Sequence, residues 1–134
     1  MEFEYRLSNI DDAISFILEH AQSKTILFYG EMGAGKTTLI KNLVKKLNSQ
    51  DQVVSPTFSL VNEYETDDDK IFHFDFYRIE DENEAYDIGF EDYLEQSGWK
   101  FIEWPQKIQN LIPADHQKLE VKKKDAETRL LKFS

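Results

Sequence analysis

The chain of 134 residues contains no cysteine. This absence excludes disulfide bonds, thiolate catalysis and cysteine-based zinc sites together. No signal peptide and no long apolar stretch are evident either, so we expect a soluble, cytoplasmic protein that does not act at a membrane. With 40% hydrophobic and 13% aromatic residues, residues 1–134 should fold as one globular domain around a single core.

Positive charge is also scarce. Lys and Arg number 16 against 26 Asp and Glu, which gives a net charge of −10. An acidic protein binds nucleic acid poorly by itself, because phosphate contacts need Lys and Arg concentrated on one face. The cluster Lys122, Lys123 and Lys124 is explained well enough as the solvated end of a strand. If RNA is involved, we expect another subunit to bind most of it.

Glycine is sparse as well, yet three of the 5 glycines fall within residues 30–35. The spacing of Gly30, Gly35, Lys36 and Thr37 satisfies the phosphate-loop pattern G-x-x-x-x-G-K-[ST]. Glycines allow backbone conformations with positive φ, so successive N–H groups can curl around a phosphate. The Lys36 amino group can reach the β- and γ-phosphates, and the Thr37 hydroxyl can ligate Mg²⁺.

The sequence on either side of the loop supports this reading. Residues 24–29, KTILFY, are β-branched and aromatic, as is typical of a buried strand. After the loop, Leu39, Leu43 and Leu47 share one face of a predicted helix, with lysines opposite. The positive end of that helix dipole faces the same anion. Because strand, loop and helix occur in the required order, we expect this loop to bind a nucleoside triphosphate.

The whole chain predicts an α/β fold: a single P-loop NTPase-like domain with a mixed central sheet flanked by helices. Ser8 is the expected N-cap of a helix in which Ile10 and Ile14 fall at helical spacing. Two short helices broken at Gly89 are expected within residues 80–98. Strands are expected at residues 3–7, 24–29, 55–65, 70–79, 99–105, 117–123 and 127–133, with hairpins joining the third to the fourth and the sixth to the seventh.

The predicted strand at residues 70–79 alternates in character. Its phenylalanines face one side, whereas His73 and Asp75 face the other. Asp75 lies near the end of a strand beside the phosphate loop, where ligands of open α/β sheets gather and where a Mg²⁺-bound water needs an acceptor. An exposed strand aspartate is the alternative. His73 is expected to be a half-buried strand side chain rather than a ligand or a catalyst.

Three further residues are candidates for the site. Glu103 ends an apolar strand, where Mg²⁺ coordination or orientation of the attacking water would explain a carboxylate, with an ordinary strand-end glutamate as the alternative. Trp104 is either core or a flat apolar surface beside the nucleotide. Thr57 follows the helix after the phosphate loop, where a switch threonine senses the γ-phosphate and Mg²⁺ in P-loop proteins.

Taken together, five segments resemble the TsaE family, also called YjeE, along most of the chain. The segments are YGEMGAGKTT, SPTFSLVNEY, HFDFYRI, DIGFEDYL and FIEWP. Their order and spacing fit the family, as do the small size and the single domain. The resemblance implies a bacterial P-loop ATPase of tRNA threonylcarbamoyladenosine synthesis. It also implies work with the TsaD–TsaB heterodimer, which handles the tRNA and the threonylcarbamoyl transfer to the adenosine beside the anticodon.

The resemblance assigns roles to individual residues. It makes Asp75 the Walker-B-like acidic residue, Glu103 a metal-site carboxylate and Thr57 part of a switch-like segment, and it places Ile10 against the nucleotide base. The expected nucleotide-binding residues are Ile10, Met32, Gly33, Ala34, Gly35, Lys36, Thr37, Thr38, Thr57 and Trp104. The expected catalytic residues are Lys36, Asp75 and Glu103, and the expected Mg²⁺ ligands are Thr37, Asp75 and Glu103.

ATP hydrolysis would then follow from positioning and charge stabilisation. Arg78 is the only arginine in the central part of the chain, the others being Arg6 and Arg129. Without a clear arginine finger, turnover should be slow until a partner completes the site, and ATP should reset the partner complex. A small-molecule kinase, the first alternative, would need more arginines and a longer chain. A regulatory module without hydrolysis, the second, does not account for two candidate carboxylates.

Overall fold

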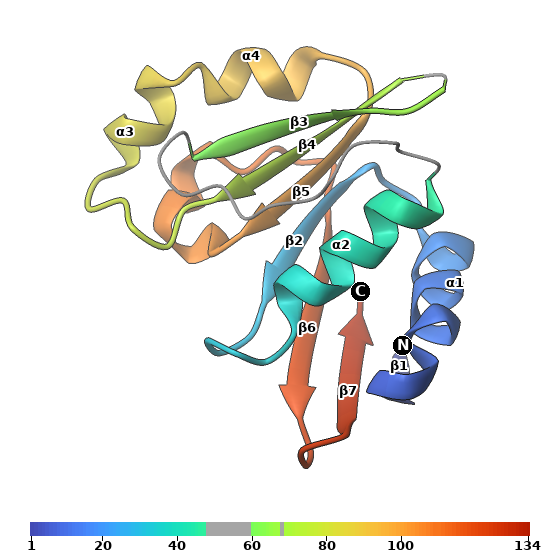
Figure 1. The fold of residues 1–134 in the computed structure, drawn as a ribbon. Coiled ribbons are helices and arrows are strands. Elements are labelled where there is room, and N and C mark those ends of the chain that lie inside the picture. The colour runs from blue at the N-terminus through green and yellow to red at the C-terminus, as the bar shows by residue number, and fades with distance from the viewer. Residues whose placement is uncertain (48–59, 68) are drawn as a thin grey trace.

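The computed structural model describes residues 1–47, 60–67 and 69–134. It confirms the α/β class, with a seven-stranded mixed sheet flanked by helices (Figure 1). The strands are β1 (Glu2–Arg6), β2 (Thr25–Tyr29), β3 (Val61–Glu65), β4 (Lys70–Asp75), β5 (Trp99–Glu103), β6 (Gln117–Lys123) and β7 (Thr128–Phe133). The helices are α1 (Ile10–His20), α2 (Lys36–Lys46), α3 (Glu82–Asp87) and α4 (Phe90–Glu95), with 3₁₀ helices η1 (Leu7–Asn9) and η2 (Pro105–Leu111).

The order of strands across the sheet is β1-β7-β6-β2-β5-β4-β3. The central strands β6, β2, β5 and β4 pair in parallel. Antiparallel pairs add β7 and β1 at one side and β3 at the other, which confirms both predicted hairpins. Because the carboxyl ends of parallel strands meet at one edge, Tyr29, Asp75 and Glu103 arrive at the same edge of the sheet.

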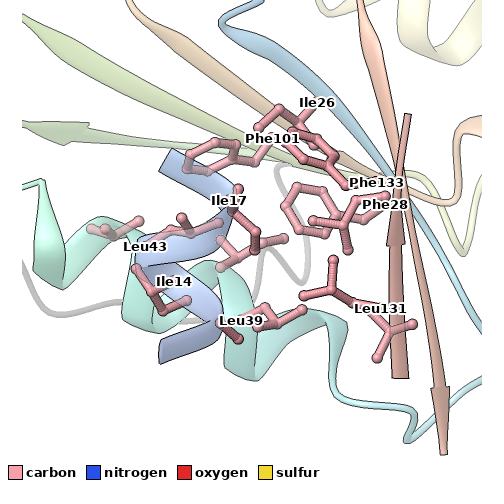
Figure 2. Close-up of a cluster of buried hydrophobic side chains, with 14 of the residues drawn as sticks. Ile14, Ile17, Ile26, Phe28, Leu39, Leu43, Phe101, Leu131 and Phe133 are labelled. Atoms are coloured by element: carbon pink, nitrogen blue, oxygen red, sulfur yellow. The ribbon is translucent and has the colours of Figure 1, made fainter. Parts of the chain in front are cut away.

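Helices α1 and α2 lie on one face of the sheet and pack over the larger of two cores (Figure 1). Their apolar side chains recur at intervals of three or four residues, so each helix buries one stripe. Figure 2 shows these stripes meeting side chains of β2, β5 and β7: Ile14, Ile17, Leu39 and Leu43 from the helices, and Ile26, Phe28, Phe101, Leu131 and Phe133 from the strands. This packing fixes the start of α2 against the end of β2.

The opposite face carries a second core under α3, α4 and η2. Phe74 of β4 lies edge-on to Phe90 of α4, with ring centroids 5.0 Å apart. Ile108 of η2 is fully buried in the same cluster. Strands β2, β4 and β5 are therefore covered on both faces, which explains their nearly continuous apolar sequences.

Two boundaries differ from those expected. The strand predicted for residues 70–79 ends at Asp75, because the chain then turns: the N–H of Tyr77 donates to Asp75 Oδ1 at 3.1 Å, and that of Ile79 donates to the carbonyl of Phe76 at 3.4 Å. Ser8 is not an N-cap: it lies in η1, and α1 starts one residue after Asn9, whose Oδ1 accepts the N–H of Arg6 at 2.8 Å.

The two short helices do separate at Gly89, which has a φ of 83°. The first part of the strand predicted for residues 55–65 lies outside the described residues. In the part of the chain that the structure describes, no helix combines the length and the apolar character needed to cross a membrane.

Candidate active site

The phosphate loop joins β2 to α2 along residues 30–35. Gly30, Gly33 and Gly35 all adopt positive φ, at 149°, 80° and 111°, a region that residues with side chains rarely enter. Gly35 is the N-cap of α2, and no described side chain caps that end of the helix. The first N–H groups of α2 therefore remain available to a phosphate, with the helix dipole favouring negative charge there.

The back of the loop is held by the C-terminal hairpin of β6 and β7. A Cβ added to Gly30 would lie 2.8 Å from the carbonyl oxygen of Val121 in β6, so only glycine fits there. The guanidinium of Arg129 in β7 donates from Nε to the carbonyl of Ala34 at 3.0 Å. Arg129 is 6% exposed, and it also donates to carbonyls of the hairpin turn. No local sequence pattern predicts this role of Arg129, because Ala34 lies 95 positions away in the chain.

Lys36 is directed into the loop. Its side chain is only 5% exposed, its amino group donates to the Gly30 carbonyl at 2.6 Å, and that group lies 3.7 Å from the centroid of the Trp104 ring. Burial lowers the pKa of Lys36, and the nearby charges of Glu103 and Asp75 partly oppose this effect. Glu103 and Asp75 act on Lys36 through their charges. A bound triphosphate would place anionic oxygens in direct contact with the Lys36 amino group.

Thr37 and the two candidate carboxylates come together at the edge of the sheet. Asp75 and Glu103 are register partners on the adjacent parallel strands β4 and β5, so their side chains emerge on the same face. Thr37 Oγ1 donates to Glu103 Oε1 at 2.9 Å. Asp75 Oδ1 accepts the N–H of Tyr77 at 3.1 Å. Burial raises the pKa of Asp75, and the charge of Glu103 adds to this effect, whereas the bond from Tyr77 opposes it.

An open cavity of about 270 Å³ lies in front of these groups. Nearly all the expected phosphate and metal residues line it, and Tyr77 joins them. The lining residues are Met32, Gly33, Gly35, Lys36, Thr37, Thr38, Asp75, Tyr77, Glu103 and Trp104. The fold thus assembles one site from the loop after β2 and from the ends of β4 and β5.

The chemistry of these donors suits Mg²⁺. Thr37, Asp75 and Glu103 offer hydroxyl and carboxylate oxygens, which this hard cation prefers. Within residues 1–47, 60–67 and 69–134, no three His, Asp or Glu side chains are grouped so as to hold a metal ion by themselves. Nucleotide enzymes usually bind Mg²⁺ with one or two protein oxygens, which share the ion with phosphates and water.

His73 differs from the expectation. It is fully buried rather than half-buried, and its Nε2 lies 2.6 Å from Glu103 Oε2. The reason is its place on β4, an inner strand between β3 and β5, two residues before Asp75 and on the same face, where the ring of Tyr64 lies 6.5 Å from its own. Sequence alternation indicated the face, but it could not show that Glu103 on another strand would lie within hydrogen-bonding distance.

Trp104 follows β5 with a positive φ of 58°, and its half-buried ring lies 4.9 Å from that of Tyr77. It lines the 270 Å³ cavity and also a second one of about 680 Å³ between the loop and the end of β6. The ring also packs against the second core, so it combines the two expected placements, and its contact with a nucleotide stays a prediction.

Two predicted nucleotide residues are not placed in the site. Ile10 begins α1 and packs, half-buried, against the larger core, and it lines neither cavity beside the loop. Thr57 lies outside the described residues. Ala34 lies in the loop but is 5% exposed and lines only the larger cavity.

The chain matches a family model described as "Threonylcarbamoyl adenosine biosynthesis protein TsaE" over residues 5–131. Three relatives carry the name tRNA threonylcarbamoyladenosine biosynthesis protein TsaE. That of Haemophilus influenzae is 38% identical over 72% of this chain and 63% of its own length. That of Bacillus subtilis is 33% identical over 78% and 65%, and that of Aquifex aeolicus 39% identical over 78% and 77%. The chain thus spans under two thirds of the first two curated relatives.

A solved structure shows the same fold. The crystal structure of YdiB from Bacillus subtilis superposes with a TM-score of 0.71, covering 99% of this chain and 84% of the other at 21% sequence identity. At this identity the similarity establishes the arrangement of strands and helices.

Proposed function

The chain belongs to the TsaE family, and from that premise we propose that it binds ATP with Mg²⁺ and hydrolyses it slowly in the cytoplasm. The hydrolysis serves the modification of tRNA with threonylcarbamoyladenosine, the pathway after which its relatives are named. A TsaD–TsaB heterodimer is the partner that this cycle resets or activates.

One observation supports hydrolysis above all. Thr37 of the phosphate loop donates to Glu103 at 2.9 Å, and Asp75 stands beside Glu103 on the next strand, facing the open cavity. A module that only bound a nucleotide would need the loop and its lysine. Two carboxylates at the same edge are useful where a metal and an attacking water must be oriented.

Each residue then has a part. The N–H groups of the loop and of the first turn of α2 hold the phosphates, and Lys36 neutralises charge on the β- and γ-phosphates. Thr37, Glu103 and Asp75 would hold the metal, and one of the carboxylates orients the attacking water. Mg²⁺, when bound, would neutralise negative charge that develops on the phosphate oxygens. Trp104 shields one side of the triphosphate.

The site lacks one component of a fast P-loop enzyme. No arginine lines the 270 Å³ cavity in the described part of the chain, and Arg129 is buried in contacts with the loop and hairpin. An arginine that stabilises the transition state accelerates such reactions by about 10³–10⁵. Slow turnover alone and acceleration by the partner follow from this.

The tRNA contact should be indirect. Lysines of the C-terminal hairpin lie beside carboxylates: Lys122 is 3.4 Å from Glu120, and Lys132 is 3.7 Å from Glu2. With these neighbours and a net charge of −10, the protein should not shift tRNA in a gel at physiological salt, whereas it should shift a TsaD–TsaB–tRNA complex. A shift of free tRNA at micromolar protein would contradict this assignment.

The function is tested by measuring ATP binding by calorimetry and phosphate release, with and without TsaD–TsaB. We expect binding that requires Mg²⁺ for full affinity, slow release alone and faster release with the heterodimer. A kinase would transfer phosphate to an acceptor instead of water, and a regulatory module would bind without release. Either result would overturn the proposed hydrolysis.

A further inference from the structure

His73 is a buried polar residue that the proposed chemistry does not yet use. It occupies β4 opposite Phe101 of β5, with no exposed surface, and Glu103 is 2% exposed. The distance from Nε2 to Oε2 is 2.6 Å, which is short for a nitrogen–oxygen hydrogen bond. Hydrogen bonds to a charged carboxylate are shorter than those between neutral groups. A fully buried histidine therefore contacts the carboxylate of Glu103 at the candidate site.

Among the described residues, each oxygen of Glu103 receives one donor. Oε1 accepts from Thr37 Oγ1 at 2.9 Å, and Oε2 accepts from His73 Nε2. When Thr37 turns to a metal ion, as the resemblance implies, the histidine remains the donor that fixes the plane of the carboxylate. Without it, the carboxylate could rotate away from the cavity.

The second ring nitrogen indicates that His73 is not there for packing alone. Nδ1 is buried and has no hydrogen-bond partner in the described structure. Buried polar atoms are nearly always paired, so an orphan calls for an explanation. An apolar side chain would fill the same space without it. Since Nε2 faces a carboxylate oxygen, which only accepts hydrogen bonds, we assign a proton to Nε2.

We propose that His73 is a positioning residue, whose Nε2–H holds Oε2 of Glu103 so that Oε1 faces Thr37 and the cavity. The inference rests on the proposed hydrolysis, in which Glu103 acts on the metal and the attacking water. Partners that orient the ligands of a metal typically change affinity or activity by about 10–100-fold when they are removed.

The test compares His73→Leu, which removes the donor, with His73→Gln, whose side-chain amide can donate from a similar position. Phe101→Leu is the packing control, because Phe101 is the buried register partner of His73. For each variant we would measure the melting temperature, Mg²⁺-dependent ATP binding by calorimetry, and phosphate release with TsaD–TsaB. Side-chain ¹⁵N NMR of the free protein would identify the protonated nitrogen of His73.

We expect His73→Leu to lower stimulated kcat by about 10–100-fold and to weaken the Mg²⁺ dependence of ATP binding. His73→Gln should restore much of both, and Phe101→Leu should lower the melting temperature with kcat retained. The NMR signal should show a proton on Nε2, and this signal should move in Glu103→Gln.

Wild-type kcat and Mg²⁺ dependence in a folded His73→Leu variant would overturn the positioning role. So would equal loss of kcat and melting temperature in His73→Leu, His73→Gln and Phe101→Leu, since that pattern is loss of packing. If the wild type releases no phosphate even with TsaD–TsaB, the proposed hydrolysis fails instead, and the NMR and Mg²⁺ measurements still decide whether His73 positions Glu103.

Discussion

Replacing Lys36 with methionine should weaken ATP binding strongly while leaving the stability of the protein almost unchanged. The variant keeps most of the buried stem and removes the charge. In the free protein, that charge is held by the Gly30 carbonyl at 2.6 Å and by the Trp104 ring at 3.7 Å, in a position where only 5% of the residue is exposed. Burial lowers the pKa of Lys36, so the cation already lies in an environment that disfavours it.

The loss of ATP affinity can be calculated from the contacts that the Lys36 amino group gives up and those that it gains when ATP binds. Hydrogen bonds from a charged donor contribute about 1.5–3 kcal/mol each, so two bonds to phosphates give a gross gain of about 3–6 kcal/mol. Leaving the Gly30 carbonyl and the Trp104 ring costs about 2 kcal/mol. A net loss of about 1–4 kcal/mol in Lys36→Met corresponds to an affinity for ATP that is weaker by about 5–900-fold.

Calorimetry with ATP and Mg²⁺ measures this loss, and urea unfolding without nucleotide measures the stability. We expect the free energy of unfolding to change by no more than about 1 kcal/mol, because the lost contacts are offset by relief of a desolvated charge. Lys41→Met, at an exposed position on the same helix, is the control and should bind ATP normally. A folded Lys36→Met protein that binds ATP within threefold of wild type would refute the reasoning.

Two further predictions concern the loop and the edge of the sheet. Gly30→Ala should lower the free energy of unfolding by about 2–4 kcal/mol, because its φ is positive and the added Cβ would meet the Val121 carbonyl. Gly33→Ala has a positive φ but open space around it, so it should lower the free energy of unfolding by about 1–2 kcal/mol. Equal losses in urea unfolding would contradict the predicted contact with Val121. The pKa of Asp75 is raised in the folded protein, so its favourable contribution to stability is present at acid pH and is lost as pH rises through the folded pKa. Asp75→Asn should therefore melt at a higher temperature than wild type at pH 7, with the gain shrinking toward pH 4, and a pH-independent difference would show that ionisation is not the cause.

The phosphate loop could be predicted because the residues that define it are close together in the sequence. Gly30, Gly35, Lys36 and Thr37 are fixed by sequence spacing, and the strand and helix beside them follow from apolar periodicity. The two hairpins were also predictable, since alternating strands next to short polar turns have few other ways to pair. These features set the fold class and the position of the site.

The remaining features depend on contacts between distant parts of the chain. His73 and Glu103 are 30 positions apart, and Arg129 and Ala34 are 95 apart, so no local pattern could indicate that either pair would touch. Alternation did give the face of β4 that carries His73, but its complete burial depends on side chains from other parts of the chain, such as Tyr64, whose ring lies 6.5 Å from that of His73.

Their positions at strand ends made Asp75 and Glu103 candidates for Mg²⁺ and water contacts, with ordinary strand carboxylates as the alternative, and the resemblance to a family then assigned their specific roles. The structure brings both carboxylates beside Thr37 and the cavity. Ile10 illustrates the opposite case: its assignment to the nucleotide base has little motif behind it, and the side chain packs against the core at the start of α1. Its contact with a base stays a prediction.

The central claim is that Glu103 acts on hydrolysis much more than on ATP binding, and Glu103→Gln tests it most directly. Phosphate release with TsaD–TsaB and an ATP titration are measured on the same preparation, with Glu91→Gln at an exposed position of α4 as the control. Because Glu103 is assigned to charge that develops in the transition state, stimulated release should fall by about 100-fold or more, a much larger loss than that of ATP affinity measured with Mg²⁺. Wild-type release in Glu103→Gln would contradict the account and leave Asp75 as the remaining carboxylate.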